Sequence, residues 1–265
     1  MAEAAKPLGQ PVEATRFDLP GMSLLEHLEE LRRRIIYALI SIAVGVVATF
    51  AYAPEIFRLM ERPIMEALRA NGLSERLVYT SPTDPFNVYL KIALISGIFV
   101  ASPAVMYQVW AFISPGLYKH ERNYVLPFIF FTVGLFLAGG YFGYKVVYPA
   151  ALTFLIDYGK DFQPMITIGE YTDLFLTIII GLGVVFELPT LVFFLALMGM
   201  VDAAFLWRNF RYAVLIIFVV SAFLTPTTDI LNLCLFAAPM IILYVLSIGI
   251  AWLVHPKRRK RAATA

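Results

Sequence analysis

Two glutamates spaced one helical turn apart, Glu26 and Glu30, are the first residues whose arrangement suggests a binding surface. The segment 23–34 (SLLEHLEELRRR) has leucines at helical spacing, and Ser23 with Glu26 matches a capping box. These features predict an amphipathic helix on which the two carboxylates could face a cationic peptide beside a membrane. The alternative is structural, because Glu30 and Arg34 form a favourable i, i+4 pair that contributes only about 0.2–0.5 kcal/mol on a solvated face.

A third carboxylate, Glu121, lies in the short segment 114–122 (SPGLYKHER) between two apolar stretches. Because this segment is short and contains proline and glycine, we expect it to hold Glu121 close to the membrane surface. The alternative is a neutralising ion pair with Lys119 or Arg122. The spacing of these residues does not decide between the two.

Glu187 lies inside a long apolar stretch, in the sequence VVFELP (184–189). A charged carboxylate at the centre of a bilayer costs about 2.5–3.5 kcal/mol on insertion scales, so a functional role is the default expectation. Pro189 follows and predicts a kink that frees backbone groups near the carboxylate. The structural alternative is a protonated carboxyl group that bonds a neighbouring helix.

The signatures of nucleotide-dependent and metal-dependent catalysis are missing from the sequence. It has no glycine-rich phosphate loop and no His-Glu-x-x-His pair, and its three histidines flank apolar stretches. We therefore expect no cofactor, no metal and no enzymatic activity. The single cysteine, Cys234, is expected to be a buried thiol. Gly139 and Gly143 have the spacing of helix-packing glycines, which is weak support for close helix contact.

The composition indicates the environment in which these carboxylates lie. Of the 265 residues, 60% are hydrophobic and 15% charged, and the mean hydropathy is +0.76. Soluble domains have about 45–50% apolar and 25% charged residues. The net charge of +2 gives no reason to expect nucleic acid as a partner. Membrane lipids are the expected surroundings.

Six apolar stretches approach the roughly 20 residues that a transmembrane helix needs. They cover residues 35–53, 92–118, 123–144, 174–201, 212–228 and 230–254. The sequence TPTTD (225–229) predicts a tight turn between the last two. The predicted fold is an all-α membrane protein, a bundle of six transmembrane helices over residues 23–254. A disordered extension (1–22) and a basic tail (255–265) would flank this domain.

The distribution of lysine and arginine predicts the orientation. Basic residues gather in the N-terminal segment, the second and fourth loops and the tail, which places both termini in the cytoplasm. The first thirty residues contain no apolar stretch, so the first helix would serve as the insertion signal. Segment 54–85 is expected to cap the outer side, with a stripe of Ile56, Leu59, Met60 and Ile64 broken by Pro63. Asp84 and Pro85 are expected to start a helix.

Three segments together resemble the TatC family, the multispanning receptor of the twin-arginine protein translocase. They are EHLEELRRR (26–34), YQVWAFISP (107–115) with YKHE (118–121), and FELP (186–189). The resemblance extends to TSPTDPF (80–86) and to LTP (224–226) with Asp229, in the same order along the chain. It covers roughly residues 22–253.

The resemblance implies that Glu30 and Glu121 are the two cytoplasmic carboxylates that contact paired arginines in the signal peptides of folded cargo. The physical reason is sound, because a guanidinium group binds a carboxylate through two parallel hydrogen bonds and a lysine does not. Arg32 and Phe112 match family positions near the same site, and Arg32 is expected to orient Glu30.

The resemblance also assigns residues elsewhere in the chain. Glu187 matches a mid-membrane glutamate on the concave side, and Pro63 and Asp229 match outer positions. The implied partners are the single-span subunits TatA and TatB, with the receptor as a homo-oligomer in the cell inner (plasma) membrane.

A proton-linked secondary solute transporter that uses Glu187 is the alternative from another class. Many such transporters show internal repeats and several discontinuous helices with polar groups at the midplane. Here no repeat is evident, and Glu187 is the one ionisable residue deep in a predicted span. An intramembrane enzyme is disfavoured, because the spans supply no pair of nucleophile and base.

Overall fold

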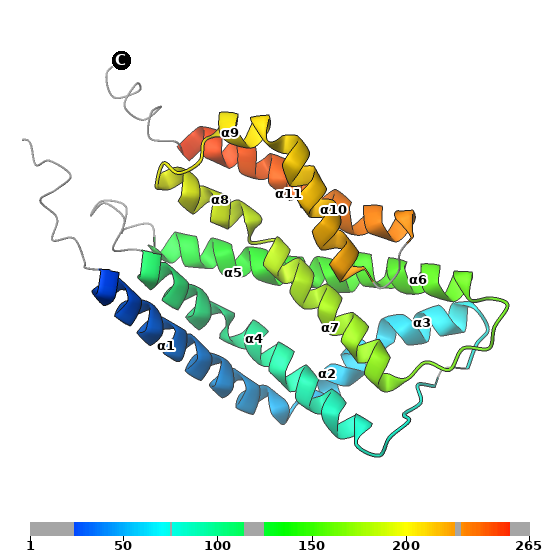
Figure 1. The fold of residues 1–265 in the computed structure, drawn as a ribbon. Coiled ribbons are helices and arrows are strands. Elements are labelled where there is room, and N and C mark those ends of the chain that lie inside the picture. Colours follow the sequence, from blue (N-terminus) through cyan, green and yellow to red (C-terminus); the bar gives the residue numbers. More distant parts are fainter. Residues whose placement is uncertain (1–23, 75, 114–124, 226–228, 255–265) are drawn as a thin grey trace, which may run out of the picture.

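The computed structural model describes residues 24–74, 76–113, 125–225 and 229–254, and their regular structure is helical (Figure 1). The one β-type contact among these residues is an isolated bridge between Val78 and Thr167. Five helical stretches of the described chain are long and apolar enough to cross a membrane, and a shorter apolar helix covers Phe210–Leu224. The predicted all-helical, multispanning fold is confirmed. The sixth span stays a prediction, because that last helix has 15 residues.

The first two long helices pack along most of their length. Helix α1 (Leu24–Phe50) joins the predicted amphipathic segment and the first span without a break, and α4 (Asp84–Ile113) runs beside it. They cross at two glycines, where a Cβ added to Gly45 would lie 2.5 Å from the carbonyl oxygen of Gly97. Close by, the Thr49 hydroxyl donates to the Ala93 carbonyl oxygen at 2.9 Å.

Helices α2 (Ala53–Met60) and α3 (Arg62–Ala70) form the segment that was expected to cap the outer side. Pro63 lies in the first turn of α3, so the break is where the sequence predicts it. The predicted apolar stripe is wrong at Leu59, which is exposed, while Leu68 is buried with Met60 and Ile64. The new helix axis after the break turns Leu68, one turn beyond Ile64, toward the core.

Asp84 begins α4 as predicted, although its carboxylate does not bond the first amides of that helix. Its Oδ2 atom accepts hydrogen bonds from the backbone amides of Thr80 at 3.0 Å and Ser81 at 2.8 Å. These residues precede the helix. The carboxylate therefore closes the turn that leads into α4.

The third long helix continues well beyond its predicted end at residue 144. Helix α5 (Val125–Phe142) passes through a π-helical turn, η3 (Gly143–Val147), into α6 (Tyr148–Tyr158). The wide turn lies just before Pro149, which has no N–H and whose ring would crowd the carbonyl of Lys145 in a regular helix. Burial of Val147 and Tyr148 holds the extended helix in the core.

Helices α7 (Ile168–Val185) and α8 (Leu188–Leu197) together form the fourth apolar stretch. Helix α7 begins earlier than predicted, because the Thr167 hydroxyl accepts a hydrogen bond from the Glu170 amide at 3.3 Å and caps it. The break between the two helices falls at Phe186 and Glu187, directly before Pro189. The kink predicted from Pro189 is confirmed.

Gly139 and Gly143 lie against α7, as their spacing predicts. A Cβ added to Gly139 would lie 2.6 Å from the Leu182 carbonyl oxygen. At Gly143, an added Cβ would lie 3.2 Å from side-chain carbons of Ile179 and Leu182. The two glycines therefore allow α5 and η3 to approach α7 closely.

Helices α9 (Ala203–Arg208), α10 (Phe210–Leu224) and α11 (Ile230–Val254) complete the fold. Asp202 caps α9, and the Tyr244 hydroxyl donates to the Leu206 carbonyl oxygen at 3.0 Å. The predicted tight turn lies mostly in residues 226–228, outside the described chain. The expectation of a buried Cys234 is wrong. Helix α11 buries Asn232 and Phe236, and Cys234, midway between them, lies on the opposite face.

Candidate functional site

Glu30 is one end of a hydrogen-bonded chain that runs through Arg34 and joins α1 to α4. Its Oε1 atom accepts a hydrogen bond from Nη2 of Arg34 at 3.2 Å, which confirms the predicted i, i+4 pair. Nη1 of Arg34 donates to Oε1 of Gln108 at 3.1 Å. The Glu30 side chain is 10% exposed, and its Oε2 atom is buried with no hydrogen-bond partner among the described residues. The carboxylate therefore keeps acceptor capacity that the fold does not use.

A hollow of about 600 Å³ lies beside Glu30. It is lined by Glu26, Glu29, Glu30, Arg32, Arg33, Ile36 and Tyr37. Three carboxylates and two guanidinium groups thus stand next to an apolar surface from Ile36 and Tyr37. This combination suits a peptide that carries both cationic and apolar residues.

Phe112 holds the end of α4 against the start of α1, the helix that carries Glu30. Its ring stacks on His27 of α1 with a centroid separation of 4.5 Å and an interplanar angle of 20°. The segment that carries Glu121 follows α4 in the sequence. Glu121 itself lies outside the described residues, and its position stays a prediction.

The expected role of Arg32 differs from what the structure shows. Arg32 lines the hollow and is exposed. The guanidinium that contacts Glu30 is that of Arg34. A residue four positions after Glu30 lies on the same helix face, whereas one two positions after it points elsewhere, which explains the difference.

Gln108 and His27 are the residues of this region to which the sequence assigned no role. Gln108 lies one helical turn before Phe112 on α4, so both side chains face α1. That spacing within the segment YQVWAF is the signal that could have found Gln108. A contact across 74 positions with Arg34 has no signature in a single sequence.

Glu187 is not part of this cluster. It sits at the α7–α8 break, midway along the molecule in Figure 1, whereas Glu30 lies near the start of α1. Its Oε1 atom is buried without a hydrogen-bond partner in the described chain, as is the hydroxyl of Thr190. Unsatisfied buried polar atoms are rare in native structures, so this pair marks a second candidate site.

The two positions expected on the outer side, Asp229 and Pro63, lie at helix starts. Asp229 precedes α11 and accepts a hydrogen bond from the Asn232 amide at 2.8 Å, the geometry of a helix cap. Its other oxygen accepts from Nδ2 of Asn232 at 3.1 Å. Pro63 is half-buried at the start of α3.

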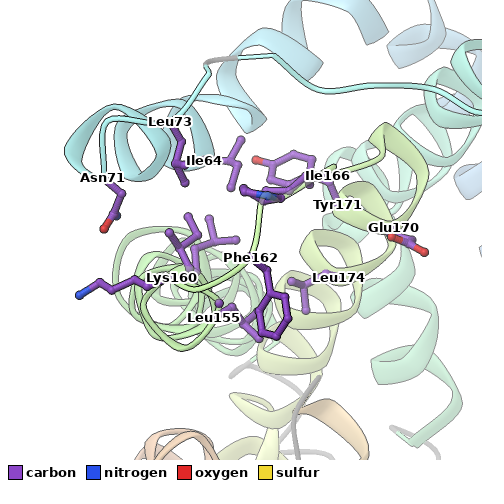
Figure 2. Close-up of a pocket in the computed structure, with 14 residues that line it drawn as sticks. Ile64, Asn71, Leu73, Leu155, Lys160, Phe162, Ile166, Glu170, Tyr171 and Leu174 are labelled. Atoms are coloured by element: carbon purple, nitrogen blue, oxygen red, sulfur yellow. The ribbon is translucent and has the colours of Figure 1, made fainter.

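A largely apolar pocket of about 440 Å³ lies between α3, α6 and α7 (Figure 2). Its wall includes Ile64, Leu155 and Leu174, and Lys160 extends away from the cavity at its edge. Asn71 and Gly159 both line it, which places the chain after α3 and the chain after α6 at the same end of the molecule. In the described parts of the chain, no group of three or more His, Cys, Asp or Glu residues could hold a metal ion.

Comparison with known proteins decides the family. A family model described as the Sec-independent protein translocase protein TatC matches residues 26–239. The chain belongs to the TatC family. The protein of that name from Koribacter versatilis is 65% identical over 247 residues, which cover 93% of this chain and 91% of the relative. The one from Carboxydothermus hydrogenoformans is 40% identical over 237 residues, which cover 89% and 95%.

The fold agrees with this assignment. A crystal structure of the twin arginine translocase receptor TatC matches with a TM-score of 0.77 and 32% sequence identity. The match covers 86% of this chain and 99% of that one. The resemblance found in the sequence is confirmed, and the protein is a multispanning membrane component of a protein translocase. The alternative of a proton-linked solute transporter is wrong.

Proposed function

We propose that this chain is the membrane receptor core of the twin-arginine translocase and that Glu30 binds the arginine pair of signal peptides on folded cargo. The observation that carries the proposal is the Glu30 carboxylate, held at a peptide-sized hollow with its Oε2 atom unpaired within the described chain. An incoming guanidinium would supply the hydrogen bonds that this oxygen lacks.

Glu121 supplies the second carboxylate. The stacking of Phe112 on His27 supports this, because it holds the last described turn of α4 against α1. Two separated carboxylates can each engage one guanidinium, so a pair of arginines gains more than one arginine or two lysines. Arg32 lines the hollow and, as a like charge, disfavours basic peptides that do not reach both carboxylates.

The remaining proposed partners contact other parts of the chain. The single-span subunits TatA and TatB would meet the membrane-embedded face near Glu187, where a polar atom is buried without a partner in the described chain. Pro63 and Asp229 would act on the outer side, in contacts between copies of a homo-oligomer. Membrane lipids of the cell inner membrane surround the apolar helices, and both termini lie in the cytoplasm.

Site-specific photo-crosslinking tests the proposed function. A photoreactive residue at Ile36, inside the hollow, is expected to capture a twin-arginine precursor. Changing the precursor's arginines to lysines should reduce the adduct about tenfold, the effect of losing one charge-assisted hydrogen bond. The control places the same residue at Phe162, which is exposed at the opposite end of the molecule. Equal capture at both positions would refute the proposal.

A further inference from the structure

We infer that Arg34 and Gln108 are positioning residues, which hold the Glu30 carboxylate in the orientation that favours paired arginines over paired lysines. The inference rests on the proposed function, because it needs Glu30 to be the acceptor. It concerns two side chains for which the sequence gave no such role. Neither residue needs to touch the signal peptide.

The geometry gives Arg34 two partners on different helices. One guanidinium nitrogen bonds Glu30 on α1 at 3.2 Å, and the other bonds Gln108 on α4 at 3.1 Å. The Arg34 side chain is 22% exposed, so these contacts are only partly open to water. Because α1 and α4 also cross tightly at Gly45 and Gly97, the two helices form a rigid frame for this bridge.

The bridge leaves one oxygen of the carboxylate buried and without a partner in the described chain. Oε1 of Glu30 is occupied by Arg34, whereas Oε2 has no partner among the residues that the structure describes. A carboxylate has about four acceptor positions, so Glu30 retains capacity for a second guanidinium, which binds when the peptide displaces the groups that cover Oε2. If the orientation of the carboxylate is fixed beforehand, binding costs less side-chain entropy.

The fixed orientation also explains how the site distinguishes cations. A lysine ammonium can approach a carboxylate from many directions, but a guanidinium fork needs a defined plane. A carboxylate that rotated freely would still attract both cations. We therefore expect loss of the bridge to weaken binding of the arginine peptide much more than binding of the lysine peptide.

A purely structural role for the bridge makes a different prediction. If Arg34 and Gln108 only held α1 against α4, their loss would lower the thermal stability of the protein. It would also lower the affinities for the two peptides to the same extent. The ratio of the two affinities is therefore the informative quantity. If loss of Arg34 or Gln108 changes this ratio in the wild-type protein but not in a variant that lacks the Glu30 carboxylate, the effect acts through Glu30.

The experiment measures the affinities of the purified full-length protein for a twin-arginine peptide and its twin-lysine form. The variants are Arg34→Lys, which keeps the charge but not the fork, and Gln108→Leu, each made alone and combined with Glu30→Gln. We expect each to lower the arginine-to-lysine affinity ratio about fivefold or more alone, and less than about twofold in the Glu30→Gln background. The matched control is Arg58→Lys, an exposed residue that pairs with Glu55.

Each outcome separates the inference from the function on which it rests. If Glu30→Gln removes the arginine preference while Arg34→Lys and Gln108→Leu retain it, the inference is wrong and the proposed function stands. If Glu30→Gln itself retains the preference, the proposed function fails. If the affinities for both peptides fall equally and the protein unfolds at a lower temperature, Arg34 and Gln108 have only a structural role and the inference is overturned.

Discussion

At the scale of single residues, three carboxylates of this chain show how surroundings decide what a side chain can do. Asp229 uses both oxygens on Asn232 and caps a helix. Glu30 uses one oxygen on Arg34, and its other oxygen is buried without a partner in the described chain. Glu187 has a buried oxygen with no partner in the described chain, inside an apolar stretch. The sequence marks all three as acidic, but only the contacts separate cap, acceptor and intramembrane site.

Replacement of Glu187 by glutamine tests whether peptide recognition at Glu30 is separate from the later steps of export at Glu187. Because Glu187 lies far along the molecule from Glu30, we expect Glu187→Gln to change peptide affinity by less than about twofold. Export of a folded precursor should fall, since we propose that this group meets partner helices in the membrane. A folded variant that bound no peptide would contradict the separation of the two sites.

At the scale of helices, the sequence predicted features that single residues control and missed those that packing controls. The start at Asp84 and the break before Pro189 follow from local chemistry. The continuation of α5 through η3 and α6 does not, because Lys145 and Pro149 both suggest an end. Burial of Tyr148 in the core favours the longer helix. The Arg34 bridge to Gln108 was missed for the same reason, since it depends on how α1 lies against α4.

The crossing of α1 and α4 leads to a prediction about stability. A methyl group at Gly97 would lie 2.6 Å from the backbone nitrogen of Val46, and backbone atoms cannot move away without separating the helices. We expect Gly97→Ala to destabilise the protein by about 1–3 kcal/mol, measured by thermal unfolding in detergent. Gly249→Ala is the control, because nothing lies within 4 Å of the added atom there. Equal stability of both variants would show that the crossing is not tight.

At the scale of the whole molecule, the helices divide it into two ends with different chemistry. The start of α1, the end of α4, the start of α5 and the end of α11 gather at one end (Figure 1). The Glu30 hollow belongs to that end. The opposite end carries α2, α3 and the apolar pocket. There the Val78 amide donates a hydrogen bond to the Ile166 carbonyl oxygen at 3.0 Å. Of the basic residues that predict the orientation, Arg32, Arg33 and Arg34 lie in the described chain near the start of α1, at the first end.

Topology reporters test this orientation directly. Fusions after Asn71, near Gly159 or at Asp229 should report the outer side, and Asn71 and Gly159 must agree because they line the same pocket. Fusions at the N-terminus, near Lys119, near Arg208 or at the tail should report the cytoplasm. A cytoplasmic signal at Gly159 would rule out the six-span arrangement.

The central claim is that Glu30 and Glu121 recognise the arginine pair, and the affinity of purified variants for twin-arginine and twin-lysine peptides tests it most directly. Each alanine variant should bind the arginine peptide about tenfold or more weakly, since losing one charge-assisted hydrogen bond costs about 1.5–3 kcal/mol. Glu121→Arg should bind more weakly than Glu121→Ala, and added salt should weaken binding throughout.

The matched control is Glu170→Ala, which removes an exposed carboxylate from the pocket at the opposite end and should change neither affinity. The decisive variant combines Glu30→Ala with Glu121→Ala. Our account predicts that this protein remains folded and binds the two peptides almost equally. If it preferred the arginine peptide by the wild-type margin, the two glutamates would have no part in recognition and the account would be contradicted.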